Sequence, residues 1–258
     1  MQAKKSLGQN FLSSKAIVSR IAGYGDVKKG ELVIEIGPGK GILTAALLEK
    51  EADVTVIEKD DRLIPLLTEK FKEFPQFNII HADVLETEIE KIVGERKYKV
   101  IANIPYYITG EILRRFLEAK HKPETMVILV QKEVAERIAT RDGKESILSL
   151  SVKAFGEPKV CEKVKKEMFS PVPKVDSSVL KIDNISGSNF KDKTKREKFF
   201  TLVKAGFLHK RKVLVKNLSD AGFEREKILE TLHSFGKNEK ARAEELPLSF
   251  WLKLLEKI

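Results

Sequence analysis

The tetrapeptide Asn103-Ile104-Pro105-Tyr106 contains residue types that can hold a flat exocyclic amine. It directly follows residues 99–102, a short apolar run typical of a buried strand. The Asn103 side-chain oxygen and the Ile104 carbonyl can both accept hydrogens of the amine, which favours a tetrahedral nitrogen with a free lone pair. Pro105 fixes the turn without a competing N–H, and Tyr106 can stack on the ring that bears the amine. The alternative is an ordinary proline turn after a strand, so the interpretation depends on a cofactor site upstream.

Such a site is indicated at residues 33–41, where an apolar strand leads into a glycine turn that opens a helix. The pattern is E-x-G-x-G-x-G, and Ile42 stands where a dinucleotide fingerprint needs its third glycine. Gly37 and Gly39 allow a tight turn and a close approach of the backbone to a ligand. The pattern resembles the first motif of methyltransferases that use S-adenosylmethionine, a cofactor without a pyrophosphate. Glu35 is equally suited to orient the turn from beneath without touching a ligand.

Carboxylates follow the next two predicted strands. Glu58 closes the second strand, 21 residues after Gly37, where a carboxylate can accept both hydroxyls of a ribose. Asp83 follows the third strand and can accept the exocyclic amine of an adenine. Strand-end carboxylates are common by chance, but three successive strand ends carry the glycine turn, Glu58 and Asp83 in the right order. A single cofactor site is therefore the better interpretation.

The apolar runs from residue 31 to residue 128 alternate between strand-like and helical patterns. This alternation predicts an α/β fold with a doubly wound, mostly parallel Rossmann-like sheet and helices on both faces. The expected strands are residues 32–36, 54–57, 77–80, 100–102 and 126–130, and the expected helices are residues 41–50, 61–71 and 109–119. Further along, we expect a helix at 131–140, an apolar stretch at 146–155 and strands at 158–165 and 177–182.

A polar stretch at residues 183–193 is typical of a linker. We therefore expect a large domain over residues 1–183 and a small all-helical domain over residues 184–258. The helices expected in the small domain are residues 195–205, 213–219, 226–232 and 248–256.

The net charge of +10 is unevenly distributed along the chain. Residues 181–258 carry 18 Lys and Arg against 11 Asp and Glu, whereas residues 1–180 carry 30 against 27. From charge alone, a nucleic-acid partner for the C-terminal domain and a solvated, lysine-rich surface are equally good interpretations.

The composition argues against several other kinds of protein. Cys161 is the single cysteine, so no disulfide within the chain and no thiolate metal site is expected, which fits a reducing cytosol. The four histidines are scattered, and we expect no catalytic metal. No apolar run approaches the ~20 residues of a membrane span, and the N-terminus has no apolar signal core. A cytoplasmic protein without a membrane partner is expected.

Taken together, these motifs resemble the ribosomal RNA adenine N6,N6-dimethyltransferase family over nearly the whole chain. Residues 103–106 are similar to the N/D-P-P-Y motif of amino methyltransferases that act on nucleic-acid bases. Residues 4–12 resemble the family's opening motif, in which Asn10 and Leu12 would contact the cofactor. Residues 168–177 resemble its F-x-P-x-P-x-V motif, in which Phe169 would cover the other face of the target adenine; a core position is the alternative. The resemblance places further cofactor contacts at Gly37, Glu58, Asp83 and Asn103.

The C-terminal segment resembles the family less closely. Residues 204–212 are similar to a basic helix of the family, on which Lys210, Arg211 and Lys212 would bind RNA phosphates. A solvated helix face is the alternative for these three residues. Residues 241–246 also match the family.

The resemblance implies a function in ribosome biogenesis. The expected enzyme is a monomer that uses S-adenosylmethionine to place two methyls on each of two adjacent adenines, in a hairpin near the 3′ end of small-subunit (16S) ribosomal RNA, within a pre-ribosomal particle. Methylation of large-subunit RNA or of DNA, and a mainly non-catalytic role in ribosome assembly, remain alternatives. The N-I-P-Y-Y sequence and the basic C-terminal segment favour the small subunit.

Overall fold

The computed structural model of this protein describes residues 9–140 and 143–258, so residues 4–8 of the opening motif lie outside the described residues. The chain divides into two compact units. The large unit comprises Met1–Ala135 and Glu157–Ile185, and the helical unit comprises Glu136–Gly156 and Ser186–Ile258. The division after residue 185 lies close to the boundary expected from sequence. The helical unit also includes residues 136–156, which we expected to belong to the large domain.

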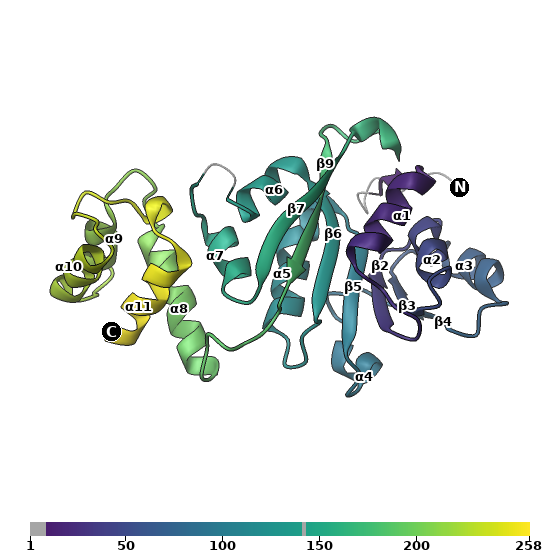
Figure 1. The fold of residues 1–258 in the computed structure, drawn as a ribbon, viewed down its shortest axis with the longest axis horizontal. Coiled ribbons are helices and arrows are strands. Elements are labelled where there is room, and N and C mark those ends of the chain that lie inside the picture. The colour runs from purple at the N-terminus through teal and green to yellow at the C-terminus, as the bar shows by residue number, and fades with distance from the viewer. Residues whose placement is uncertain (1–8, 141–142) are drawn as a thin grey trace. The chain divides into compact units, whose positions relative to one another are not determined.

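The large unit is built around a seven-stranded sheet in the order β4-β3-β2-β5-β6-β9-β7 (Figure 1). Strands β2 to β6 pair in parallel, and β9 lies antiparallel between β6 and β7. The predicted doubly wound, mostly parallel sheet is therefore confirmed. The strands are β2 (Leu32–Ile36), β3 (Asp53–Glu58), β4 (Phe77–His81), β5 (Tyr98–Asn103), β6 (Thr125–Gln131), β7 (Glu157–Val164) and β9 (Ser177–Asp183).

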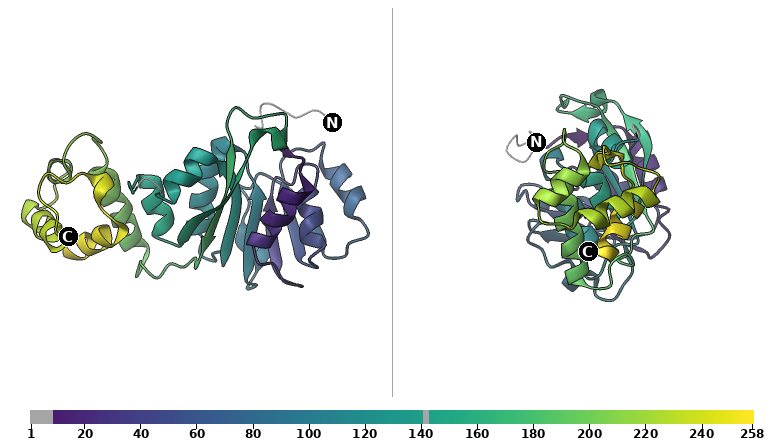
Figure 2. Two further views of the ribbon diagram at one scale, coloured as in Figure 1. Left: turned by 45° about the horizontal axis from the view of Figure 1, so that its top comes forward. Right: turned by 90° about the vertical axis from the view of Figure 1, so that its left-hand side faces the viewer.

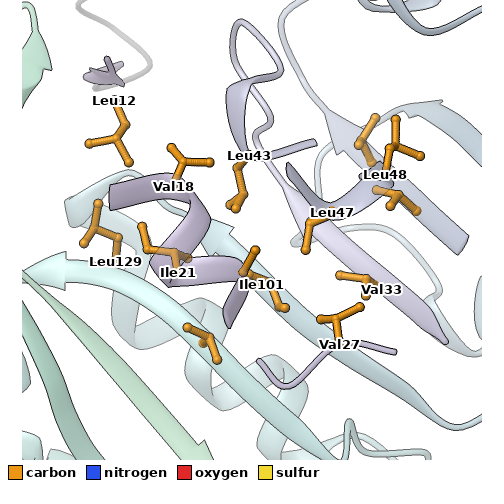
Figure 3. Packing of buried hydrophobic residues seen from close by; sticks show 14 of the residues in the cluster. Leu12, Val18, Ile21, Val27, Val33, Leu43, Leu47, Leu48, Ile101 and Leu129 are labelled. Atoms are coloured by element: carbon orange, nitrogen blue, oxygen red, sulfur yellow. The ribbon is translucent and has the colours of Figure 1, made fainter. Parts of the chain in front are cut away.

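Helices cover both faces of this sheet. Val33 and Ile101 belong to a buried cluster with residues of α1 and α2 on one face (Figure 3). Figure 1 shows α5 on the opposite face, and the alternate strand residues Ile34 and Val100 are also fully buried. Burial on both faces explains why the strands read as continuous apolar runs. The helices of the large unit are α1 (Lys15–Tyr24), α2 (Ile42–Leu48), α3 (Ile64–Phe71), α4 (Ile89–Val93) and α5 (Thr109–Glu118), and α6 (Lys132–Ile138) crosses into the helical unit.

The strand order creates a switch point between β2 and β5. The chain runs outward from β2 through β3 to β4, and then returns to β5 on the other side of β2. Open α/β sheets bind ligands at the carboxyl ends of the strands at such a point. Gly37 directly follows β2 and Asn103 ends β5, so the topology brings the two sequence motifs to the same edge of the sheet.

A two-stranded antiparallel sheet joins distant parts of the large unit. It consists of β1 (Phe11–Leu12) and β8 (Phe169–Ser170), neither of which was expected from sequence. The Ser13 amide and hydroxyl both donate to the Met168 carbonyl, at 2.9 and 2.8 Å. This pairing ties the described start of the chain to the proline-containing segment that follows β8.

The helical unit has its own core, and Figure 2 shows its C-terminal helices, coloured green to yellow, gathered together. Phe199, Phe250 and Trp251 are fully buried, and the Trp251 indole N–H donates to the Leu246 carbonyl at 3.2 Å. The four helices expected here are confirmed as α8 (Lys193–Gly206), α9 (Leu214–Asp220), α10 (Arg225–Ser234) and α11 (Leu248–Lys257). The apolar stretch at 146–155 forms a further helix, α7 (Ile147–Lys153), which begins with a capping box.

Candidate active site

A cavity of about 340 Å³ opens at the carboxyl edge of the large unit's sheet. Its lining comes from the N-terminal segment, the glycine turn, the ends of β3 and β4, and the turn after β5. This convergence is expected because the carboxyl ends of parallel strands meet at one edge. All of the cofactor residues expected from sequence line the cavity: Asn10, Leu12, Gly37, Gly39, Glu58, Asp83 and Asn103.

The two glycines of the turn serve different physical purposes. Both have left-handed backbones, with φ of 61° at Gly37 and 58° at Gly39. A Cβ added at Gly39 would lie 2.7 Å from the Phe11 ring, so this glycine makes room for β1. A Cβ added at Gly37 would meet nothing within 4 Å. Gly37 therefore leaves open space beside the cavity, where a ligand can approach the backbone closely.

Glu58 presents a buried carboxylate at the end of β3. It is 5% exposed and accepts hydrogen bonds from the Asp60 amide at 2.8 Å and the Gly39 amide at 3.4 Å. Burial raises the pKa of Glu58 from its usual value. Both carboxylate oxygens therefore accept backbone hydrogen bonds and retain further acceptor capacity for a ligand hydroxyl.

Asp60 connects this strand end to the N-terminal segment, a contact that sequence reasoning missed. Its buried carboxylate accepts from Gln9 Nε2 at 2.8 Å and from the Arg62 guanidinium at 2.5 Å. The hydrogen bonds from Arg62 hold the pKa of Asp60 well below its usual range. A second carboxylate two residues after Glu58 is visible in the sequence, but nothing local pairs it with a residue 51 positions earlier.

Asp83 lies just beyond β4 and is held from two directions. It accepts from Lys59 Nζ at 2.6 Å and from the Leu85 amide at 2.9 Å. Partial burial acts to raise the pKa of Asp83, but these hydrogen bonds outweigh it and lower the pKa. The Thr87 hydroxyl donates to the Asp83 carbonyl at 2.7 Å, and Arg115 of α5 donates to the Thr87 carbonyl. The Asp83 carboxylate is thus an ionised acceptor, and the hydrogen bonds of Thr87 and Arg115 hold the loop that carries it.

The amide of Asn103 is oriented by the N-terminal segment. Asn103 Nδ2 donates to the Asn10 carbonyl at 3.1 Å, which leaves Oδ1 as the acceptor available to a ligand. The next residue, Ile104, has a buried side chain, and its carbonyl accepts no hydrogen bond within residues 9–140 and 143–258. Pro105 has φ of −58° and fixes the turn into α5. Within the described residues, two acceptors without competing partners therefore stand at the end of β5.

The two aromatic residues expected to hold a base are placed differently. Tyr106 lines the cavity, and its hydroxyl is 2.6 Å from the Ser177 hydroxyl of β9. This bond fixes the direction of the Tyr106 ring. Phe169 is 2% exposed, packs in the buried cluster and is absent from the cavity lining. Its packing matches the alternative of a core residue, so its contact with a base stays a prediction.

Glu35 lies beneath the glycine turn with its carboxyl group buried. Thr44 of α2 donates to it at 2.7 Å. Burial raises the pKa of Glu35 to about 8, so the carboxyl group is mostly protonated at neutral pH.

This buried acid predicts a pH-dependent stability. Because the folded pKa of about 8 lies above the ordinary value of 4.5, the contribution to stability is full below pH 4.5 and is lost as the pH rises through 8. The free energy of unfolding of the wild type should fall relative to that of Glu35→Gln between about pH 5 and pH 8, by about 1.4 kcal/mol for each pH unit in this window. Urea unfolding at both pH values measures this difference, and replacing the exposed Glu49 by Gln is the control. Parallel pH profiles of Glu35→Gln and the wild type would contradict the prediction.

The basic residues Lys210, Arg211 and Lys212 are exposed but do not lie on a helix, so their predicted helical placement was wrong. They occupy the turn between α8, which ends at Gly206, and α9, and we call residues 210–212 the basic turn. The physical reason lies in Asn217, whose buried Nδ2 donates to the Gly206 carbonyl at 2.7 Å and to the His209 carbonyl at 3.2 Å. These bonds satisfy carbonyls that would otherwise continue the helix.

Metal-ligating side chains are not clustered in the described part of the chain. No group of three or more His, Cys, Asp or Glu residues there is arranged to hold a metal ion. Among the described residues, no helix combines the length and apolar character needed to cross a membrane.

Fold and cavity together define a Rossmann-like methyltransferase, with a glycine turn, two strand-end carboxylates and an oriented amide in sequence order. Solved structures support this class. A 23S rRNA methyltransferase, ErmE, is similar at 28% identity with a TM-score of 0.78, covering 96% of this chain and 99% of that one. A dimethyladenosine transferase from Plasmodium falciparum is similar at 26% identity with the same TM-score, covering 96% of both chains.

Sequence relatives identify the family. A protein of Dehalococcoides mccartyi named ribosomal RNA small subunit methyltransferase A is 43% identical, covering 98% of this chain and 88% of its own. A protein of the same name from Fusobacterium nucleatum is 37% identical, covering 98% and 96%. The family model described as ribosomal RNA adenine dimethylase matches residues 1–258. The chain belongs to this family and is a methyltransferase.

Proposed function

We propose that this enzyme uses S-adenosylmethionine to dimethylate N6 of two adjacent adenines in a hairpin near the 3′ end of small-subunit ribosomal RNA. The observation that carries the proposal is the orientation of Asn103. Its Nδ2 is occupied by the Asn10 carbonyl, so its Oδ1 is left at the cavity as an acceptor for an amine.

The lining of the cavity fits the cofactor. Gly37 leaves open space where the methionine part can pass close to the backbone. Glu58, at the end of β3, would accept the ribose hydroxyls, and the ionised Asp83 would accept the adenine amine. When bound, the cofactor supplies a sulfonium methyl as the electrophile. Leu12 and Asn10 close the cavity from the N-terminal side.

The residues after β5 prepare the base for transfer. The N6 lone pair of adenine is delocalised into the ring, so the amine is a poor nucleophile. Acceptance of its hydrogens by Asn103 Oδ1 and the Ile104 carbonyl localises the lone pair on nitrogen for in-line attack on the methyl. The cofactor would supply the methyl group and retain the electrons of its S–C bond, and the methylated nitrogen would lose its proton to water. Tyr106 stacks on the flipped base, and no general base with a tuned pKa is required.

Several features support the small subunit as the target. Relatives at 43% and 37% identity carry the name of a small-subunit enzyme, whereas the 23S enzyme of similar fold is 28% identical. We further propose that the monomeric, cytoplasmic enzyme acts on a pre-ribosomal particle, to which the helical, basic domain over residues 184–258 docks.

The decisive experiment is transfer of labelled methyl groups to undermethylated small subunits, compared with naked small-subunit RNA, large subunits and DNA. The expected result is transfer to small-subunit material, with mass spectrometry locating two adjacent dimethyladenines. Transfer only to large subunits, or only to DNA, would show that this nucleic acid is the substrate in place of small-subunit RNA. Failure to bind the cofactor in calorimetry would instead favour a purely non-catalytic assembly factor.

The basic turn provides a separate prediction. Replacing Lys210, Arg211 and Lys212 by Ala should weaken binding to the RNA substrate and reduce the slope of log K against log salt by about 2, because fewer counterions are released. Cofactor affinity should not change. A control with the same loss of charge replaces Lys28, Lys29 and Lys97, which lie away from the cavity lining. An unchanged salt slope in the basic-turn variant would exclude phosphate contacts there.

A further inference from the structure

Tyr107 is an exposed aromatic residue at the mouth of the cavity. It lies in the short 3-10 helix η2 (Tyr106–Ile108) that leads into α5. Its exposed fraction is 63%. Of the large apolar side chains exposed within residues 9–140 and 143–258, Tyr107 alone lines the cavity. Exposure alone is ordinary for a single side chain, so its position beside the reacting group is the informative feature.

The two adjacent tyrosines cannot serve the same base. The Tyr106 hydroxyl is fixed to Ser177, and its ring direction is therefore set. A 3-10 helix has three residues per turn, so consecutive side chains diverge by about 120°. Tyr107 thus offers its ring to a different occupant from the one that Tyr106 contacts.

The charge around Tyr107 fits a nucleic-acid strand. Lys59 lines the cavity together with Tyr107, and its side chain is 60% exposed, with its ammonium group 2.6 Å from the Asp83 carboxylate. Lys40 also lines the cavity. Aromatic rings flanked by cations are the usual platform for unstacked bases, because the ring takes the base and the cations take the phosphates.

We propose that Tyr107 is the stacking platform for the base next to the target adenine, and that it holds this base while the target occupies the cavity. This inference rests on the proposed function, in which two adjacent adenines react. One adenine then lies on Tyr107 while the other is methylated, which keeps the strand in register between the two reactions.

The test measures equilibrium binding of an RNA hairpin with two adjacent loop adenines to the full chain, with S-adenosylhomocysteine present. A second hairpin has an abasic site in place of one of the two adenines. The wild type should bind the abasic hairpin about tenfold more weakly, as expected for one lost base–aromatic stack. Tyr107→Ala should bind the intact hairpin about tenfold more weakly and should show no further loss on the abasic hairpin. Tyr107→Phe, which keeps the ring, should behave as the wild type, and Phe74→Ala, at an exposed ring outside the cavity, serves as the control.

Three results would overturn the inference. The first is equal binding of both hairpins by the wild type. The second is that Tyr107→Ala still binds the abasic hairpin about tenfold more weakly than the intact hairpin. The third is a loss of cofactor affinity in Tyr107→Ala that is large enough to explain its weaker RNA binding. Failure of the proposed function is distinguishable, because then neither the wild type nor any Tyr107 variant would transfer a methyl group to small-subunit material.

Discussion

Asn103→Ala is expected to lower the rate of methyl transfer by at least about a hundredfold, the cost of removing one preorganised hydrogen-bonding group from an active site. The Asn103 oxygen is one of only two acceptors proposed to localise the amine lone pair, and alanine has no replacement for it. The fold should survive, because Asn103 is partly exposed at the end of β5 rather than in the core. Single-turnover transfer to undermethylated small subunits, with saturating cofactor, measures the chemical step directly.

Two further variants sharpen this experiment. Asn103→Asp keeps an acceptor oxygen but loses the N–H that donates to the Asn10 carbonyl, so it should retain more activity than the alanine variant. Asn78→Ala, at an exposed asparagine of β4 outside the cavity, should behave as the wild type. Full activity of Asn103→Ala would exclude the proposed mechanism.

Gly37→Ala is expected to weaken cofactor binding by roughly 10- to 100-fold, because the added methyl group enters the space that the ligand needs. The substitution also forces a side chain onto a backbone with φ of 61°, which costs about 1–2 kcal/mol of stability. Isothermal calorimetry gives the affinity, and chemical unfolding gives the stability.

Gly30→Ala separates the two effects. Gly30 has a similar left-handed φ of 72° and open space at its Cβ, but it lies before β2 and does not line the cavity. This variant should lose comparable stability and keep the cofactor affinity. If both variants bind the cofactor as the wild type does, Gly37 is not the point of close approach.

The order in which the site residues follow successive strands was predictable from sequence, because it depends on local patterns. Apolar runs with flanking glycine or carboxylate mark the ends of β2, β3 and β4, and parallel pairing necessarily brings such ends to one edge. The glycine turn, Glu58, Asp83 and Asn103 could therefore be assigned to one cavity without knowing the strand order.

The basic turn and Phe169 depend on contacts that the sequence did not reveal. The family resemblance placed residues 210–212 on a helix, but the buried Asn217 side chain donates to the Gly206 and His209 carbonyls, where the chain turns. For Phe169, the sequence left a contact with the target base and a core position as alternatives. Pairing of β8 with β1 buries its side chain in the core, and its contact with a base stays a prediction.

The sequence by itself thus determined the fold class and the strand-end residues that line the cavity. Only the tertiary structure decided how those residues are oriented. Gln9 reaches Asp60 across 51 positions, Asn10 orients Asn103 across 93, and Ser13 meets Met168 across 155. No periodicity encodes such contacts, because they arise when separately formed elements pack together, and a change in that packing would leave every motif intact in the sequence.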